Sequence, residues 1–181
     1  LIDLFLKPSN RIVIFLLSQI TLLGAAFITV ATHHPSVTYA FSGMFVDDAF
    51  ADVIKLMIYL GSSLLLVYTR QYISLRGMFR GEFYALTLFS IAGMMIMVSG
   101  QHFLTLYMGL ELLSLCLYAL VALDRDNPKA TEAAMKYFVL GALASGMLLY
   151  GMSMMYGATG SLNLSEVATA LLNGSQDRPV L

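Results

Sequence analysis

Five apolar segments, each long enough to cross a lipid bilayer, set the limits on what this chain can fold into. A bilayer core of about 30 Å requires about twenty helical residues at a rise of about 1.5 Å per residue. Short segments rich in Pro, Gly, Asp, Asn or Arg separate the five stretches, as expected for turns between helices. We therefore predict an all-α, polytopic transmembrane helix bundle with at least five spanning helices, at about 12–32, 49–68, 83–99, 103–123 and 130–156.

The composition excludes a soluble domain. Hydrophobic residues make up 59% of the 181 positions and charged residues only 12%, whereas about a quarter of a soluble domain is charged. The net charge is −1, so the chain has no global basic field that would recruit nucleic acid. The expected surroundings are the lipid bilayer and other membrane proteins, and nucleic acid is not an expected partner.

The two ends of the chain indicate a fragment of a longer membrane domain. The chain begins at Leu1, and residues 1–6 resemble the end of an earlier helix. Residues 178–181 look like the approach to another apolar segment. The stretch after Arg11 is too long for the apolar region of a cleaved signal peptide, which disfavours that alternative. The amphipathic segment 162–172 is too short to span, and we predict that it lies along the outer surface.

Basic residues alternate between the connections and give the orientation, because short loops that carry Lys or Arg stay in the cytoplasm. The connections 33–48, 100–102 and 157–163 contain neither residue type. The first, third and fifth complete spans are therefore predicted to run outward. The basic residues of the predicted cytoplasmic segments are Lys7, Arg11, Arg70, Arg76, Arg80, Arg125 and Lys129.

Three ionisable residues stand out within the apolar spans: Lys55, Glu111 and Lys136. Each is costly in a membrane unless it is paired, hydrated or neutralised. Lys55 lies about 9 Å from the outer end of the second span, so its long side chain can extend toward the lipid headgroups. We favour this interfacial interpretation of Lys55 and keep it as an accessory candidate for proton transfer.

Glu111 and Lys136 are the main candidates for a site. Glu111 lies about 12 Å into the fourth span, where a glutamate cannot reach either surface. Lys136 lies about 9 Å from the cytoplasmic end of the fifth span, and we expect its ammonium group to extend toward the depth of Glu111. The two opposite charges of such a pair attract each other strongly, whereas desolvation favours the neutral form of each group. Small changes in their surroundings can therefore move a proton. A proton relay and a purely structural ion pair both fit these residues.

Neighbouring polar residues are accessory candidates. Glu132 lies one turn before Lys136, and we prefer a supporting i,i+4 pair to a role in proton delivery. His102 precedes the fourth span, where interfacial hydrogen bonding and an outer proton-exit group are both possible. The hydroxyls of Ser114, Tyr118 and Ser145 either order water between the charges or serve in helix packing. The small residues Ala142 and Gly146 predict close approach of another helix.

Motifs for redox chemistry are missing from the sequence. It contains no Gly-rich phosphate loop, CxxC cluster, paired haem-ligating histidines or nucleophile elbow. His33 and His34 stand in a loop before Pro35 without other plausible metal ligands. The single cysteine, Cys116, is interpreted as a packing residue. We expect no NADH site, redox centre, bound cofactor or metal on this chain.

Several segments together resemble a known family. They are 109–118 (GLELLSLCLY), 125–127 (RDN), 131–138 (TEAAMKYF) and 141–142 (GA), with 44–48 (MFVDD) upstream. They resemble subunit N of bacterial NADH-quinone oxidoreductase (respiratory complex I), whose organellar counterpart is mitochondrial subunit 2. The likeness is specific over about 77–164. Leu110 stands where the related subunits L and M and cation/proton antiporters usually carry Trp, which favours subunit N.

The resemblance implies that the chain is the N-terminal part of an antiporter-like fold with buried charges near mid-membrane. Glu111 and Lys136 match the family's fifth-helix glutamate and sixth-helix lysine. It further implies proton translocation coupled to quinone reduction, with NADH, FMN, iron-sulfur clusters and quinone held elsewhere in the complex. The implied partners are other membrane subunits of complex I, in the bacterial inner membrane, or in the mitochondrial inner membrane if the chain is organellar.

Two other interpretations remain open. The first is a subunit of a related multisubunit cation/proton antiporter or of a membrane-bound hydrogenase. The second, from a different class, is a structural scaffold in which Glu111 and Lys136 only fix the register of neighbouring helices.

Overall fold

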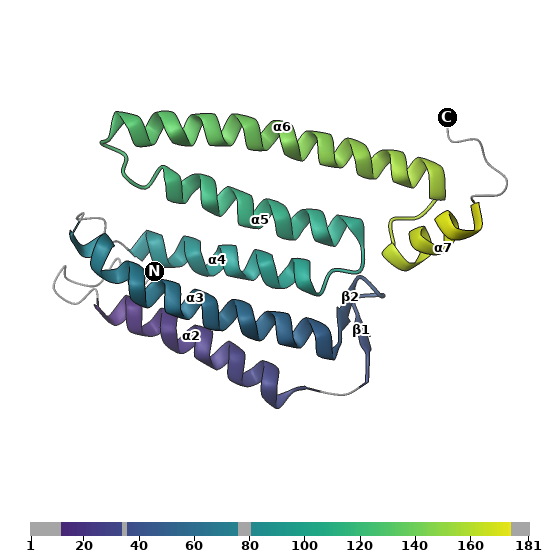
Figure 1. Ribbon diagram of the computed structural model, residues 1–181, viewed down its shortest axis with the longest axis horizontal. Helices are drawn as coiled ribbons and strands as arrows, with labels where there is room; N and C mark the ends of the chain where they lie inside the picture. The colour runs from purple at the N-terminus through teal and green to yellow at the C-terminus, as the bar shows by residue number, and fades with distance from the viewer. Residues whose placement is uncertain (1–11, 34–35, 76–80, 175–181) are drawn as a thin grey trace.

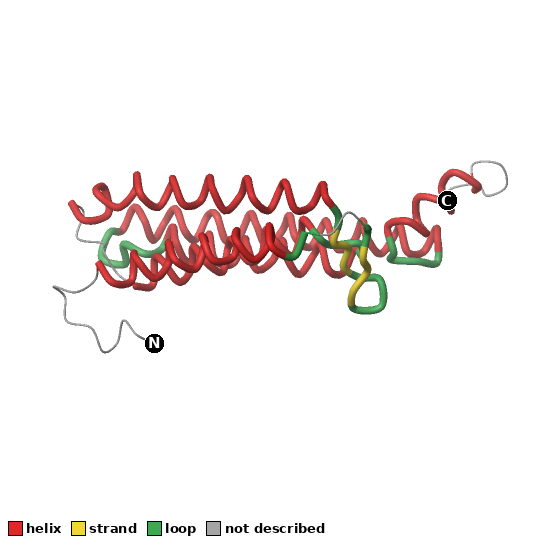
Figure 2. Tube along the Cα trace, turned by 90° about the horizontal axis from the view of Figure 1, so that it is seen from below, coloured by secondary structure: helices red, strands yellow, loops and turns green. Residues whose placement is uncertain are grey.

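A computed structural model describes residues 12–33, 36–75 and 81–174 of the chain. Five long helices run side by side within the described residues, each apolar and long enough to cross a membrane (Figures 1 and 2). The predicted all-α membrane bundle is therefore confirmed. The possible earlier helix at 1–6 and the basic residues Lys7, Arg11, Arg76 and Arg80 lie outside the described residues. The five helices are α2 (Ile12–Ala31), α3 (Ala49–Leu75), α4 (Gly81–Val98), α5 (Phe103–Val121) and α6 (Pro128–Thr159).

Two of these helices are clearly longer than their apolar stretches. We predicted an end near residue 68 for the second span, but α3 continues to Leu75. In this last part Ile73 is buried, and the Arg70 guanidinium lies 5.0 Å from the centre of the Phe15 ring on α2. Packing against α2 therefore extends the helix beyond the apolar segment.

Helix α6 is bounded by capping residues. The Asn127 side chain accepts a hydrogen bond from the Lys129 amide, and Pro128 occupies the first turn. At the other end Gly160 takes a left-handed conformation, with φ of 75°, which ends the helix. These caps set α6 at 32 residues, or about 48 Å, so it overhangs a bilayer core of about 30 Å.

Two glycines bring α4 and α5 into backbone contact. A Cβ atom at Gly93 would lie only 2.7 Å from the carbonyl oxygen of Gly109 and 2.8 Å from the Leu113 amide nitrogen. Thr105 and Cys116 are buried on the same face of α5 as Gly109. On the other side of α4, a buried cluster joins α2, α3 and α4; it consists of Phe15, Leu22, Leu66, Tyr84 and Ile91.

The predicted outer connections form a small hydrogen-bonded layer at one end of the bundle, which the sequence did not predict. Strands β1 (Thr38–Ala40) and β2 (Phe45–Asp47) make an antiparallel hairpin between α2 and α3 (Figure 2). Main-chain hydrogen bonds join residues 44–46 of this hairpin to residues 99–101, and residues 101–103 to residues 162–164. The donor and acceptor residues are Val46 to Ser99, Gln101 to Met44, Phe103 to Leu162 and Leu164 to Gln101, at 2.9 to 3.0 Å. We call the hairpin, residues 99–103 and residues 162–164 together the outer layer.

A short helix follows the long spans. Helix α7 (Leu164–Gly174) occupies the segment for which we predicted a non-spanning helix at 162–172. It lies beyond the end of α6, beside the outer layer (Figure 1), and Val167 is buried. Its placement along the membrane surface remains a prediction.

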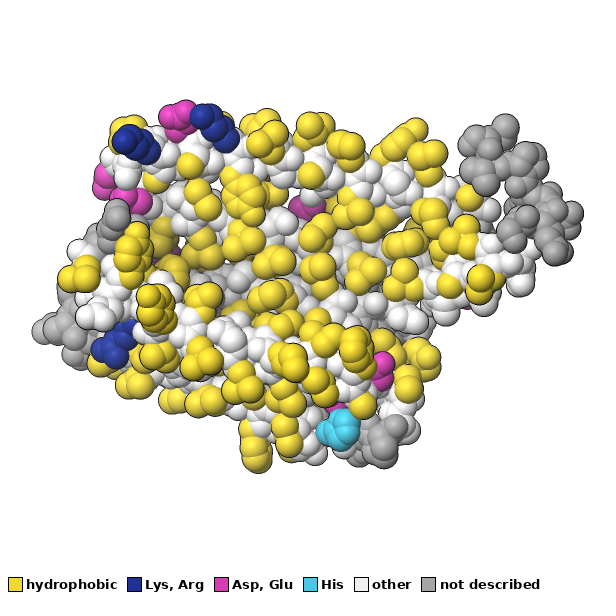
Figure 3. Space-filling view, viewed as in Figure 1, with side chains coloured by type: hydrophobic (Ala, Val, Ile, Leu, Met, Phe, Trp, Pro, Cys, Tyr) yellow, Lys and Arg dark blue, Asp and Glu magenta, His cyan; other side chains and the backbone are white. Residues whose placement is uncertain are grey.

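Basic side chains gather at the end of the bundle opposite the outer layer (Figure 3). Arg70 lies in the last turns of α3, Arg125 lies between α5 and α6, and Lys129 lies in the first turn of α6. Arg125 also bonds Glu82 of α4 at 3.3 Å. The fold thus places these predicted cytoplasmic residues on one side, in agreement with the alternation in the sequence.

Candidate functional site

Glu111 lies on the side of α5 that faces α6. Its carboxylate oxygen Oε1 accepts a hydrogen bond from the Ser145 hydroxyl of α6, and both residues are partly buried. The Tyr107 hydroxyl, one turn earlier on α5, also interacts with the Glu111 carboxylate. A carboxyl group in the middle of a spanning helix therefore has two hydroxyl partners within the bundle.

The helical period explains why Glu111 turns toward α6. Gly109 lies against α4, and a residue two positions later points to the other side of a helix with 3.6 residues per turn. The Tyr118 ring strengthens the α5–α6 contact, because it packs edge-to-face on Tyr137 and Phe138, with ring centres 4.8 and 5.6 Å apart. Gly141 leaves space for this ring, since a Cβ atom there would collide with the Tyr118 hydroxyl.

Lys136 does not face Glu111, which corrects the predicted ion pair. Its ammonium nitrogen bonds the Glu132 carboxylate at 2.6 Å, one turn nearer the start of α6, and the two side chains are 71% and 65% exposed. From Lys136 to Ser145 is about two and a half turns, or about 13 Å along the axis. The two residues therefore lie on opposite faces of α6 and at different depths. Our prediction considered depth and not the helical face.

The face of α6 that carries Lys136 is open within the described residues. The side chains of Val139, Leu143 and Met147 are each more than half exposed. The predicted close-packing pair Ala142 and Gly146 lies exposed as well, and no described atom of another helix lies within 4 Å of a Cβ placed at Gly146. The described helices therefore do not use this pair for packing, and Gly141 supports the contact with α5 instead.

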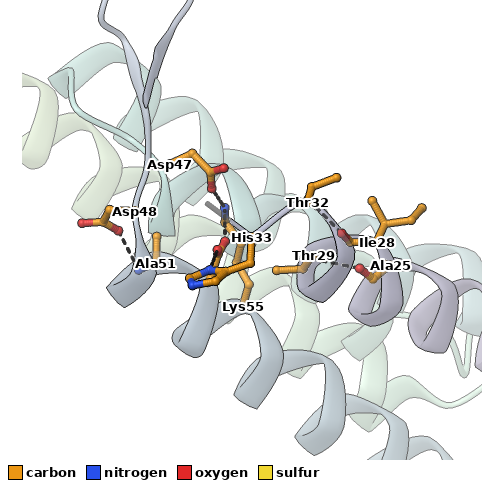
Figure 4. A network of polar contacts seen from close by, with 10 residues as sticks. Ala25, Ile28, Thr29, Thr32, His33, Asp47, Asp48, Ala51 and Lys55 are labelled. Atoms are coloured by element: carbon orange, nitrogen blue, oxygen red, sulfur yellow. Dashed lines mark hydrogen bonds and ion pairs between the residues drawn. The ribbon is translucent and has the colours of Figure 1, made fainter. Parts of the chain in front are cut away.

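Lys55 belongs to a polar network at the outer layer (Figure 4). Its ammonium nitrogen lies 2.9 Å from Asp47 of the hairpin and 3.5 Å from Asp52, whose carboxylate also bonds His33 at 2.8 Å. The hydrogen bond from Lys55 is the main reason that the pKa of Asp47 lies below its ordinary value. Lys55 thus meets two carboxylates. Asp47 and Asp52 were not among the predicted site residues, although Asp52 and Lys55 have the i,i+3 spacing of a helical ion pair.

His102 caps the start of α5. Its ring nitrogen Nδ1 accepts a hydrogen bond from the Leu104 amide at 3.2 Å, and its main chain bridges to Asn163 in the outer layer. This arrangement is the interfacial hydrogen bonding that the sequence left open. A role of His102 in proton exit stays a prediction.

Metal-ligating side chains do not gather anywhere in 12–33, 36–75 or 81–174: no three His, Cys, Asp or Glu residues lie close enough to hold an ion. Cys116 is a buried free thiol. His34 and Pro35 lie outside the described residues. The candidate proton-transfer groups of the described bundle are therefore Glu111 with its hydroxyl partners, the Glu132–Lys136 pair and the network around Lys55.

The sequence matches known membrane proteins along its whole length. Residues 100–179 match the transmembrane family described as NADH:quinone oxidoreductase/Mrp antiporter. NADH-quinone oxidoreductase subunit N of Methylovorus glucosotrophus is 71% identical over 100% of this chain, which covers 38% of that relative. The chain thus spans well under half the length of the curated relatives that it matches.

Solved structures share the fold. A chain of respiratory complex I from Thermus thermophilus, solved with bound aureothin, superposes with a TM-score of 0.70 at 32% identity, over 91% of this chain and 38% of that one. The archaeal membrane-bound sulfane sulfur reductase, a respiratory membrane complex, gives a TM-score of 0.71 over 92% of this chain and 36% of its own. At 24% identity the second likeness shows the fold alone.

Proposed function

This chain belongs with the subunit N sequences of NADH-quinone oxidoreductase, and from that relationship we propose that it forms part of the proton-translocating membrane arm of such an enzyme. The observation that carries the proposal is the 71% identity to a subunit N over the whole chain. The chain is a multi-pass protein of the bacterial inner membrane, with five spanning helices among its described residues. Its partners are the other membrane subunits of complex I.

The related antiporters and hydrogenases are the second candidate class. The family that matches residues 100–179 includes Mrp antiporters, and the fold occurs in an archaeal sulfur reductase complex. Neither observation separates the classes, because both rest on shared transmembrane architecture. The identity to subunit N favours the quinone-linked enzyme, as does Leu110 in place of the usual Trp.

Glu111 is proposed as the proton-carrying group of this part of the subunit. A carboxyl in a spanning helix exists in either charge state only if its surroundings stabilise that state. Ser145 and Tyr107 supply hydroxyl groups beside it. Lys136 and Glu132 form a separate charged pair nearer the end of the bundle that carries Arg125 and Lys129, and we propose that they act on the cytoplasmic side of the same path.

Electron transfer is proposed to take place elsewhere in the complex. NADH, FMN, the iron-sulfur clusters and quinone belong to other subunits in this proposal, and proton movement in this chain is driven by quinone reduction at a distance. The residues of this chain then bind and release protons and hold the helices that carry them.

The test measures the pH gradient formed by inverted membrane vesicles respiring on NADH. Glu111→Gln and Lys136→Ala are introduced into the complete subunit, with assembly of the complex matched to wild type. We expect both variants to lose most of the gradient per NADH oxidised. Glu82→Gln is the matched control, because Glu82 is an exposed carboxylate paired with Arg125 outside the proposed path, and it should pump normally.

The scaffold alternative makes the opposite prediction. If Glu111 and Lys136 only fix helix register, replacing them together by Gln and Met will leave the gradient intact and will not destabilise the complex. An intact gradient in the fully assembled double variant would therefore reject the proposed path through these residues.

A further inference from the structure

Ser145 is the residue of α6 that contacts the proposed proton carrier. We propose that Ser145 is a positioning residue for Glu111, whose hydroxyl donates to the ionised carboxylate and turns to the Gly141 carbonyl when Glu111 is protonated. This inference rests on the proposed function of Glu111 and deepens it. It assigns to one hydroxyl the task of stabilising both charge states of the carboxyl group.

Other helical hydroxyls of the bundle illustrate the alternative hydrogen bond that we propose for Ser145. Several of them donate to a main-chain carbonyl three or four residues earlier in their own helix, a common arrangement for Ser and Thr. Ser145 differs from these residues, because its hydroxyl donates across the helix interface to Glu111. The hydroxyls that bond their own helix are those of Ser18, Thr21, Thr29, Thr87, Ser90 and Thr159.

The two charge states of Glu111 need different partners. An ionised carboxylate accepts hydrogen bonds only, whereas a protonated one also donates. A serine hydroxyl donates one hydrogen and accepts others, so it can serve both forms. In the protonated state Glu111 donates to the Ser145 oxygen, and the Ser145 hydrogen turns to Gly141, four residues earlier. Ser145 keeps its own hydrogen throughout, and the transported proton arrives at and leaves from Glu111.

The surroundings make this contact important. Both side chains are partly buried between α5 and α6, where a polar group without a partner is costly. Among the described residues, Lys136 and its Glu132 partner lie on the opposite face of α6 and do not neutralise Glu111. The hydroxyls of Ser145 and Tyr107 are therefore the groups that stabilise the carboxylate in this part of the bundle.

The experiment uses the complete subunit in the assembled complex and compares Ser145→Ala, Ser145→Thr, Ser153→Ala and Glu111→Gln. Ser153→Ala is the matched control, since Ser153 is an exposed hydroxyl on the same helix with no carboxylate bond among the described residues. One readout is the pH dependence of NADH-driven proton pumping. The other is the infrared carbonyl band of the protonated carboxyl that disappears in Glu111→Gln.

Ser145→Ala should move the pH dependence of pumping toward alkaline pH by up to about one unit, because a hydrogen bond to an ionised group is stronger than one to a neutral group, so losing the hydroxyl destabilises the ionised carboxylate more than the protonated carboxyl. Its carbonyl band should move to higher frequency, as expected for a less hydrogen-bonded carboxyl. Ser145→Thr keeps the hydroxyl and should restore both properties. Ser153→Ala should match wild type in both.

The outcomes separate this inference from the proposed function. If Glu111→Gln abolishes pumping while Ser145→Ala keeps the wild-type pH dependence and carbonyl band, Glu111 carries protons but Ser145 does not position it. If Glu111→Gln pumps normally, the proposed function of the carboxyl fails, whatever Ser145→Ala does.

Discussion

Replacing Gly93 by Ala should separate α4 from α5. The added Cβ atom would lie 2.7 Å from the Gly109 carbonyl oxygen and 2.8 Å from the Leu113 amide nitrogen. Both are main-chain atoms, so no side chain can turn away, and one helix must shift. Overpacking costs about 1 to 3 kcal/mol, and the better helix propensity of Ala returns up to about 1 kcal/mol. We expect a net loss of about 1 to 2 kcal/mol.

Thermal unfolding of the complete subunit in detergent measures this loss. Cys116 is buried on the α5 face that contacts α4, so a thiol-reactive fluorescent dye reports its exposure when Cys116 is the only cysteine retained. A loss of about 1 to 2 kcal/mol lowers the melting temperature of a unit of about 150 to 250 residues by about 2 to 8 °C, and the decrease should be smaller in the longer complete subunit.

The control is Gly61→Ala in α3, where no described atom of another helix lies within 4 Å of the new Cβ. It should melt at or above the wild-type temperature, because Ala favours helix without a collision. If Gly93→Ala has the same melting temperature as Gly61→Ala, the close main-chain crossing of α4 and α5 is wrong. A lowered melting temperature in Gly93→Ala alone supports it.

Two further predictions concern the outer layer. The pKa of Asp47 is lowered chiefly by the hydrogen bond from Lys55, so this contact stabilises the fold above the unfolded value of about 3.9 and is lost as pH falls below it. The wild-type melting temperature should thus change little between pH 7 and pH 5 and should decrease once the pH is below about 4. Lys55→Gln should have a lower melting temperature at pH 7 and a smaller decrease in acid. If the decrease in acid is the same in Lys55→Gln as in wild type, the contact does not stabilise the fold. His102→Ala removes the cap of α5 and should cost about 1 kcal/mol, whereas His102→Asn keeps a capping side chain and should melt and pump like wild type. Lost pumping in stable His102→Asn would instead support a proton-exit role.

The sequence predicted the spans because hydropathy and length directly reflect the demands of lipid. The starts and ends of α2, α4 and α5 fall within two residues of the predicted positions. The prediction failed for the end of α3, where burial of Ile73 continues the helix beyond the apolar segment. The hairpin β1–β2 was also missed, since two three-residue strands leave little periodic signal.

The contacts of the candidate site residues were predicted in part. Glu111 was singled out by its depth, and it does face the neighbouring helix at Ser145. Its pairing with Lys136 was wrong, because depth along two helices was compared without the angular position of each residue. The partners of Lys55 were missed because one of them, Asp47, comes from the hairpin, whose fold the sequence did not predict.

The hydrogen bonds of the outer layer also imply an order of assembly. Residues 44–46 bond residues 99–101, and residues 101–103 bond residues 162–164, so the last partner in the layer is synthesised after all five described spans. During synthesis, α2 with α3 and α4 with α5 can each insert as a helical pair before their connections have permanent partners. The layer closes only once α6 has crossed the membrane and delivered Leu162 and Leu164. Its closure therefore marks the completed insertion of the bundle.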